Sequence, residues 1–171
     1  PLRHALCFTK SVETANRLVR LVAFFEEAWS RHTNTPALQV RFYSSDLGTG
    51  ERIQLLRDFQ HGHIDLLVCS DLIARGIDLP HVRHVISYDV PVDMAKYVHR
   101  VGRTARAGRA GDAWSLVEEQ EVYHFKRMLR EAGHFDHMHK HKVKSDAFDT
   151  YLPCYRDALA RLAPVSYTHL R

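Results

Sequence analysis

The sequence contains few cysteines and no long apolar run. Cys7, Cys69 and Cys154 are far apart, odd in number and form no CxxC pair, which argues against a disulfide framework and a zinc knuckle. We therefore expect a reducing compartment. No apolar run approaches the length of a membrane span, and the first residues form a strand-like pattern instead of a signal peptide, so we expect no membrane partner. The start at Pro1, without Met, indicates a fragment.

Neither positive nor negative charge is in large excess. Lys and Arg number 24 against 20 Asp and Glu, giving a formal net charge of +4. This balance permits a polyanion partner without requiring one. A chain of 171 residues that is 45% hydrophobic is long and apolar enough to form one folded unit, for which we expect a monomer with a tail.

Short apolar runs alternate with segments in which apolar residues recur at helical spacing. The predicted strands cover residues 5–8, 38–43, 64–69, 82–88 and 113–117, and the predicted helices run from residue 12 and over residues 51–59, 94–101 and 119–132. Such alternation indicates parallel βαβ units with right-handed crossovers. The expected fold class is therefore α/β, a doubly wound parallel sheet whose ligands bind at the carboxyl ends of the strands.

The C-terminal quarter of the sequence differs in composition from the rest. We predict a main domain over residues 1–133, a basic, His-rich connector over 134–149, an amphipathic helix over 150–164 that packs back on the domain, and a disordered or non-native tail over 165–171. Within the main domain, Trp114 is expected to be a core or helix-packing residue instead of a base-stacking platform.

The densest functional signal is a cluster of arginines after the predicted strand at 82–88. Arg100, Arg103 and Arg106 are spaced by three residues on or next to the predicted helix at 94–101, so we expect them to share roughly one face. Guanidinium groups bind phosphate oxygens bidentately and neutralise charge on a transferring phosphoryl group. Gly102 would let a backbone or a partner approach closely. The alternative is a solvated basic helix end.

A second polar segment, residues 70–78, directly follows the most apolar predicted strand, which places it at the ligand edge of the sheet. A loop with Asp71, Arg75 and Asp78 around a glycine can hold a ribose hydroxyl on a carboxylate and orient arginines that arrive from elsewhere. The backbone N–H of Gly76 can face a phosphate. The alternative is a tight turn with an ordinary surface ion pair.

Together and in this order, the two segments resemble motifs of the C-terminal RecA-like (P-loop NTPase-type) domain of DEAD-box ATP-dependent RNA helicases in superfamily 2. The letters that carry the resemblance are ARGID and YVHRVGRTARAG, with ALCFTKS as the family's motif IV, and it covers roughly residues 3–133. It implies that Arg103 and Arg106 are arginine fingers and that His99 and Arg100 couple the nucleotide to another domain. It further implies that Asp71 approaches the ATP ribose.

The resemblance also implies an ordering role for Arg75 and Asp78 at the interface, and a second ligand, RNA. The RNA backbone would be held by Thr9 or its neighbours, Arg52, Ser70 and Gly76, through contacts that do not read sequence. Four residues depart from the family pattern. Ser70 replaces the usual Thr and keeps a hydroxyl, Thr49 replaces a frequent Gln, and residues 44–45 are Ser-Ser instead of His-Gly.

Finer features resemble a DEAD-box subgroup that acts in large ribosomal subunit assembly. These are the stretch Tyr43-Ser44-Ser45, Ala105, and the helix that ends with residues 128–133. They imply pre-ribosomal RNA and ribosome-assembly factors as partners, and a location in the nucleus and nucleolus.

Two motifs that ATP hydrolysis needs do not occur in the sequence: a GxxxxGK[ST] loop and an acidic Asp-Glu-Ala-Asp-like run. The sequence therefore lacks the residues that would bind Mg²⁺ and activate the attacking water. In the family these parts belong to an N-terminal RecA-like domain of the same chain, and the two domains close over ATP and RNA. We expect this fragment alone to be inactive.

Three other functions stay open at this point. One is a non-catalytic RNA-binding module, and another is a DNA helicase of the same superfamily, such as a RecQ-like enzyme. The third is a metal-binding tail formed by His137, His139 and His141; alternate histidines without a cysteine or carboxylate at ligand spacing argue against it, and we predict no metal site.

Overall fold

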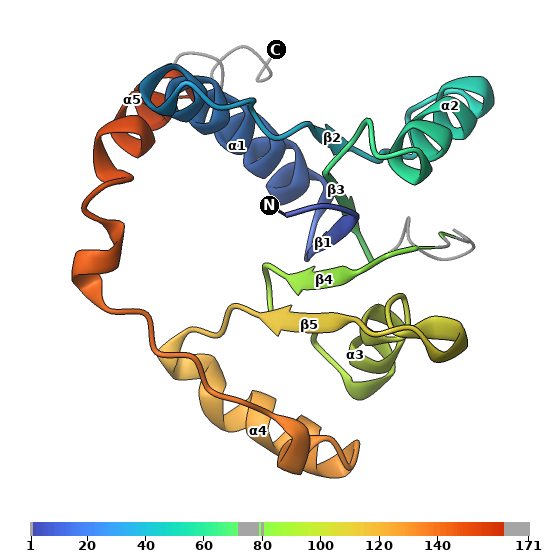
Figure 1. The fold of residues 1–171 in the computed structure, drawn as a ribbon. Coiled ribbons are helices and arrows are strands. Elements are labelled where there is room, and N and C mark those ends of the chain that lie inside the picture. Colours follow the sequence, from blue (N-terminus) through green and yellow to red (C-terminus); the bar gives the residue numbers. More distant parts are fainter. Residues whose placement is uncertain (1, 72–78, 80, 163–171) are drawn as a thin grey trace, which may run out of the picture.

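The most apolar segments of the sequence form the two central strands of a parallel sheet. Strands β1 (Ala5–Thr9) and β3 (Leu66–Ser70) are buried over their whole length, as expected for strands covered on both faces. The other strands are β2 (Val40–Phe42), β4 (His84–Ser87) and β5 (Asp112–Ser115). In the computed structural model, which describes residues 2–71, 79 and 81–162, the strand order is β2-β3-β1-β4-β5 (Figure 1). The predicted α/β class with a parallel sheet is confirmed.

Helices cover the two faces of this sheet. Along β1, alternate side chains face opposite sides, so Phe8 belongs to one apolar core and Cys7 to another. Helix α2 (Thr49–Gln60) packs on the Phe8 side through Phe59, and α1 (Val12–Thr33) packs on the Cys7 side. The carboxyl edge of the sheet is left between these layers.

A third apolar cluster joins α3 (Met94–Val101) to α4 (Val122–Glu131). Its buried members are Val90, Tyr97, Phe125, Met128 and Leu129. The predicted helix at 119–132 begins as a 3-10 turn, Glu119–Glu121, before α4 starts. Among the described helices, none combines the length and apolarity needed to cross a membrane.

The C-terminal segment folds back on the domain. Helix α5 (Leu152–Leu162) lies beside α1 (Figure 1), where the rings of Tyr151 and Trp29 are 4.8 Å apart and Arg161 donates to Glu27 over 2.7 Å. Residues 134–149 link α4 to α5 with short 3-10 turns at Phe135–His137 and Ser145–Phe148. The division of the chain at residues 133, 149 and 164 stays a prediction, and the expected tail, 165–171, lies outside the described residues.

Trp114, predicted to be a core or helix-packing residue, does not belong to the core. Its side chain lies on β5 and is 46% exposed. Strand β5 is the last strand of the described sheet, and the apolar cluster that α1 covers draws on the strands from β2 to β4 and includes no residue of β5. Edge position, which a single sequence does not reveal, therefore leaves this large side chain in contact with solvent.

Candidate functional site

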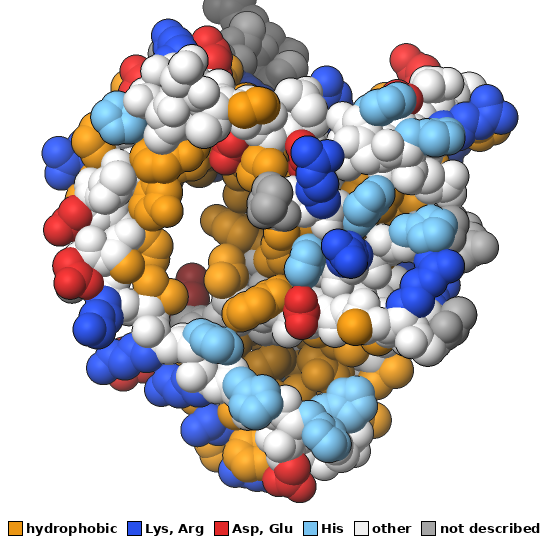
Figure 2. Space-filling view, in the orientation of Figure 1, with side chains coloured by type: hydrophobic (Ala, Val, Ile, Leu, Met, Phe, Trp, Pro, Cys, Tyr) orange, Lys and Arg blue, Asp and Glu red, His pale blue; other side chains and the backbone are white. Residues whose placement is uncertain are grey.

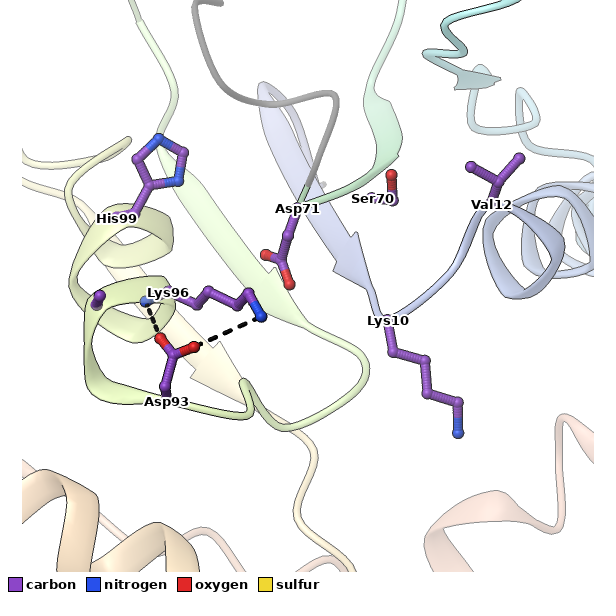
Figure 3. Close-up of a pocket in the computed structure, with 8 residues that line it drawn as sticks. Lys10, Val12, Ser70, Asp71, Asp93, Lys96 and His99 are labelled. Carbon is purple, nitrogen blue, oxygen red and sulfur yellow. Dashed lines mark hydrogen bonds and ion pairs between the residues drawn. The ribbon is translucent and has the colours of Figure 1, made fainter.

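The polar ends of the central strands meet at one edge of the sheet. Thr9, the last residue of β1, is in register with Ser70, the last residue of β3, and Asp71 follows directly. Because the strands are parallel, their carboxyl ends lie together. A pocket of about 740 Å³ opens at this edge (Figure 3), and it is lined by Lys10, Val12, Ser70, Asp71, Asp93, Ala95, Lys96 and His99.

A buried ion pair fixes Asp71, the residue directly after β3, to α3. The Arg100 side chain is 1% exposed, and its Nε and Nη2 donate to the two carboxylate oxygens of Asp71 over 2.6 and 2.7 Å. Its Nη1 donates to the carbonyl oxygen of Asp89 over 2.6 Å, and its guanidinium carbon lies 5.4 Å from the ring centroid of Phe8. Bidentate geometry and a third acceptor compensate the desolvation of this charge. The two predicted segments, 70–78 and 99–106, are thus joined at Asp71 and Arg100.

The start of α3 is held by its N-cap. The Asp93 carboxylate accepts a hydrogen bond from the backbone N–H of Lys96 over 2.7 Å, and this hydrogen bond lowers the pKa of Asp93 below its usual value. The Lys96 ammonium lies 3.5 Å from the same carboxylate, and Figure 3 shows both contacts at the wall of the pocket. His99, one turn further along α3, also lines the pocket.

Helix α3 ends before the last two arginines of the cluster. Gly102 is its C-cap, and a Cβ atom there would lie 3.0 Å from the carbonyl oxygen of Val98, closer than most side chains tolerate. Arg106 belongs to a 3-10 turn that starts after Ala105, whose φ of 55° is left-handed. The prediction of one shared helical face is therefore wrong: Arg100 points into the protein and Arg106 is exposed.

The two remaining arginines make local contacts with the end of α3. Arg103 Nε donates to the carbonyl oxygen of His99 over 3.3 Å, and its Nη2 contacts His99 Nε2. Arg106 Nε donates to the carbonyl oxygen of Gly102 over 2.6 Å. Basic side chains at these carbonyl oxygens suit the negative end of the helix dipole. Both arginines therefore stay near the C-terminus of α3, Arg103 next to His99 and Arg106 next to Gly102.

The residues predicted to contact RNA differ in whether their polar side-chain atoms have hydrogen-bond partners. Thr9 is fully buried and its hydroxyl donates to the carbonyl oxygen of Ser11 over 2.9 Å, while its neighbour Lys10 lines the pocket. In contrast, the buried Ser70 Oγ and Arg52 Nε have no hydrogen-bond partner within the described chain. Buried polar atoms are rarely left unpaired, which makes both candidates for ligand contact.

Three predicted site residues, Arg75, Gly76 and Asp78, lie outside the described residues. Sequence reasoning missed the contributions of Lys10, Asp93 and Lys96 to the pocket. The signal for Asp93 was present, because an Asp directly before the predicted helix at 94–101 is a typical N-cap.

The histidines of residues 134–149 do not assemble as metal ligands. Within the part of the chain that the structure describes, no three His, Cys, Asp or Glu side chains gather as a metal ion requires. The imidazole of His141 instead lies against the indole of Trp114, with ring centroids 5.3 Å apart.

Comparison with known proteins adds to this geometry. Residues 2–108 match the family described as helicase conserved C-terminal domain. The chain is 43% identical over 130 residues to the ATP-dependent RNA helicase dbp6 of Schizosaccharomyces pombe, covering 76% of the chain and 21% of that protein. It is 40% identical over 157 residues to the human ATP-dependent RNA helicase DDX51, covering 92% of the chain and 22% of that protein. The chain thus spans about a fifth of the length of these relatives.

Among solved structures, the C-terminal domain of the DEAD-box protein Dbp5 superimposes with a TM-score of 0.65 at 27% identity, over 94% of this chain and 83% of that one. The family match includes β1, β3, α3 and the arginines that follow α3. The chain therefore belongs to the helicase C-terminal domains, with the RecA-like fold of the DEAD-box proteins.

Proposed function

We propose that this chain is the C-terminal lobe of an ATP-dependent RNA helicase that unwinds RNA duplexes or remodels RNA–protein complexes. The observation that carries the proposal is the Arg100–Asp71 ion pair, which holds the end of β3 and the end of α3 at one pocket. In this role Arg100 positions Asp71, because its own guanidinium is buried. The two relatives' names, both RNA helicases, support the choice of RNA over DNA.

The nucleotide contacts follow from the same placement. Arg103 and Arg106, near His99, would face the phosphates of ATP held by an N-terminal RecA-like domain, and Gly102 leaves room beside them. The Asp71 carboxylate would accept a hydrogen bond from a ribose hydroxyl in addition to those from Arg100, since each carboxylate oxygen accepts more than one hydrogen bond. Mg²⁺ would be held by the N-terminal domain. Arg75 and Asp78 are proposed to order this interface.

The RNA contacts are proposed for the turn after β1, for Ser70 and Gly76, and for Arg52. The unpaired Ser70 Oγ and Arg52 Nε support this assignment. Phosphate and ribose contacts of this kind bind RNA without reading its sequence. A role in large ribosomal subunit assembly, with pre-ribosomal RNA as the substrate and the nucleolus as the location, is proposed from the resemblance of residues 43–45, Ala105 and the end of α4.

The test uses alanine at the two proposed arginine fingers. In the full-length protein, Arg103→Ala and Arg106→Ala should each lower RNA-stimulated ATP hydrolysis by about 10³ to 10⁵. RNA binding by the 171-residue chain should stay within about twofold of wild type. Arg109→Ala is the matched control, since the Arg109 side chain contacts His81 and should leave hydrolysis intact.

Two other outcomes would redirect the assignment. A loss of RNA binding that equals the loss of hydrolysis would favour a non-catalytic RNA-binding module. Competition between single-stranded RNA and single-stranded DNA of the same sequence decides between an RNA and a DNA helicase, and a preference for DNA would contradict the proposal.

A further inference from the structure

The connector between α4 and α5 carries a row of lysines at alternate positions. Residues 139–144 read His-Lys-His-Lys-Val-Lys, and every one of them is exposed. The backbone has extended dihedral angles at Met138 and at Lys144, and no helix or turn interrupts it between them. In an extended segment, alternate side chains point to the same side. Lys140, Lys142 and Lys144 stand at alternate positions of this segment, and we call these three side chains the lysine row.

The lysine row has no acidic partner within the described chain. Lys10 and Lys96, by comparison, pair with Asp89 and Asp93. No carboxylate of the described residues pairs with the three lysines of the row. Its positive charge is thus left for a partner of opposite sign.

The other side of the same segment is held against the sheet. His141 contacts Trp114 on β5, with ring centroids 5.3 Å apart. The three lysines of the row are exposed, whereas His141 between them contacts Trp114. Figure 2 shows Lys, Arg and His side chains gathered along the connector, next to an opening bordered by hydrophobic side chains. Trp114 therefore acts as an anchor for the connector.

We propose that the lysine row binds the phosphate backbone of RNA outside the pocket at the carboxyl edge. Alternate residues of an extended chain are about 6.6 Å apart, which is of the order of the spacing between successive phosphates in an extended single strand. Lysine ammonium groups bind phosphates as point charges, without reading the bases. The proposal rests on the proposed function insofar as it takes RNA to be the ligand. An acidic peptide is the competing ligand, but Val143, the exposed apolar residue of this segment, alternates with the lysines and so offers the row no apolar anchor for peptide side chains.

The test measures binding of a labelled single-stranded oligouridine RNA of about 20 nucleotides to the 171-residue chain by fluorescence anisotropy, from about 50 to about 200 mM salt. The triple variant Lys140→Gln, Lys142→Gln, Lys144→Gln should bind about tenfold more weakly at the lower salt concentration. Each phosphate contact contributes roughly 0.7 to the slope of log K against log salt, so removing three should reduce that slope by about 2. A change in slope reports lost phosphate contacts, which a loss of folding stability does not mimic.

The matched control removes three exposed charges elsewhere, with Arg3→Gln, Arg31→Gln and Arg127→Gln. These side chains are 61%, 65% and 59% exposed, so the control changes net charge equally. Its affinity should stay within about twofold of wild type, with the slope unchanged. Trp114→Leu, which keeps an apolar side chain but removes the aromatic anchor, should weaken RNA binding by about threefold.

Three results would overturn the proposal. The first is an unchanged slope for the lysine variant, and the second is an equal loss in the arginine control. The third is tight binding of a polyglutamate peptide that the lysine variant loses while its RNA affinity is retained.

Arg52→Ala separates this proposal from the proposed function: if Arg52→Ala weakens RNA binding but the lysine variant does not, only the lysine row is wrong. If wild type binds no RNA at all, the RNA part of the proposed function fails as well.

Discussion

Arg100 and Asp71 form a bidentate ion pair at 2.6 and 2.7 Å, although 29 residues separate them in the sequence. The pair links the end of β3, where Ser70 lies, to the helix that carries His99. A third bond, to the Asp89 carbonyl oxygen, attaches the loop before α3. The Arg100 guanidinium thus joins three parts of the site through charge-assisted hydrogen bonds: α3, Asp71 and the loop before α3.

The ion pair should contribute strongly to stability. Arg100→Met leaves the Asp71 carboxylate, whose side chain is 19% exposed, without its partner, and removal of one member of a buried pair costs about 3 to 5 kcal/mol. The double variant Arg100→Met, Asp71→Leu should recover a large part of this loss, because no isolated charge remains. Urea unfolding of the 171-residue chain measures both.

The control for this prediction is Arg127→Met. Arg127 makes an exposed pair with Glu131 at 3.8 Å, so its loss should cost under about 1 kcal/mol. If Arg100→Met unfolds no more easily than this control, the positioning role of Arg100 in the proposed function is wrong.

The Asp93 N-cap should make the stability of α3 depend on pH. The hydrogen bond from the Lys96 N–H holds the pKa of Asp93 below its usual value in the folded state, while in the unfolded chain it is about 3.9. The carboxylate therefore contributes stability above about pH 4, and this contribution is lost as the pH falls through the folded-state pKa. Asp93→Ala should cost about 1 kcal/mol at neutral pH, and its difference from wild type should shrink toward about pH 3.

Asp93→Asn supplies the control, since Asn also caps helices but does not titrate. Its stability relative to Asp93→Ala should not change with pH in urea unfolding across the same range. If the difference in free energy of unfolding between wild type and Asp93→Ala stays the same below about pH 3, the charge on Asp93 is not involved.

The elements of this fold that were predictable are those with a single clear sequence pattern, such as a continuous apolar run. β1 and β3 are continuous apolar runs because both of their faces are covered, and such runs identify central strands directly. The bounds of α3 were predictable, because the helical spacing predicted a helix over residues 94–101 and the structure has it at Met94–Val101. The burial of Arg100 was not predictable from spacing, because only the tertiary fold brings Asp71 close enough to pair with Arg100. The exposure of Trp114 depends in the same way on which strands α1 covers.

The three cysteines should be unreactive in the folded chain. All three are buried, and burial raises the pKa of Cys7 to about 12 and also raises that of Cys69. Thiolates are the reactive species, so at about pH 8 an aromatic disulfide reagent should label no cysteine until denaturant is added, and then three per chain. The variant Arg127→Cys, at an exposed position on α4, should react with one equivalent at once. Rapid labelling of the wild-type chain under native conditions would contradict this burial.

We predict that the contact between Tyr151 and Trp29 holds the start of α5 on α1. Tyr151 and Tyr155 are almost equally exposed, at 44% and 43%, but within the described residues only Tyr151 makes ring contacts, with Trp29 and with Phe25. Aromatic pairs contribute about 0.5 to 1.5 kcal/mol beyond the apolar area that they bury, so Tyr151→Ala should lower the free energy of unfolding by about 2 kcal/mol and Tyr155→Ala by less than half of that.

In a Trp114→Phe background, Trp29 is the only tryptophan of the chain, and its fluorescence should shift to longer wavelength with Tyr151→Ala alone. Equal effects of the two tyrosine variants would mean that α5 is held by its aliphatic contacts and by the Arg161–Glu27 pair, and that the aromatic contact adds nothing.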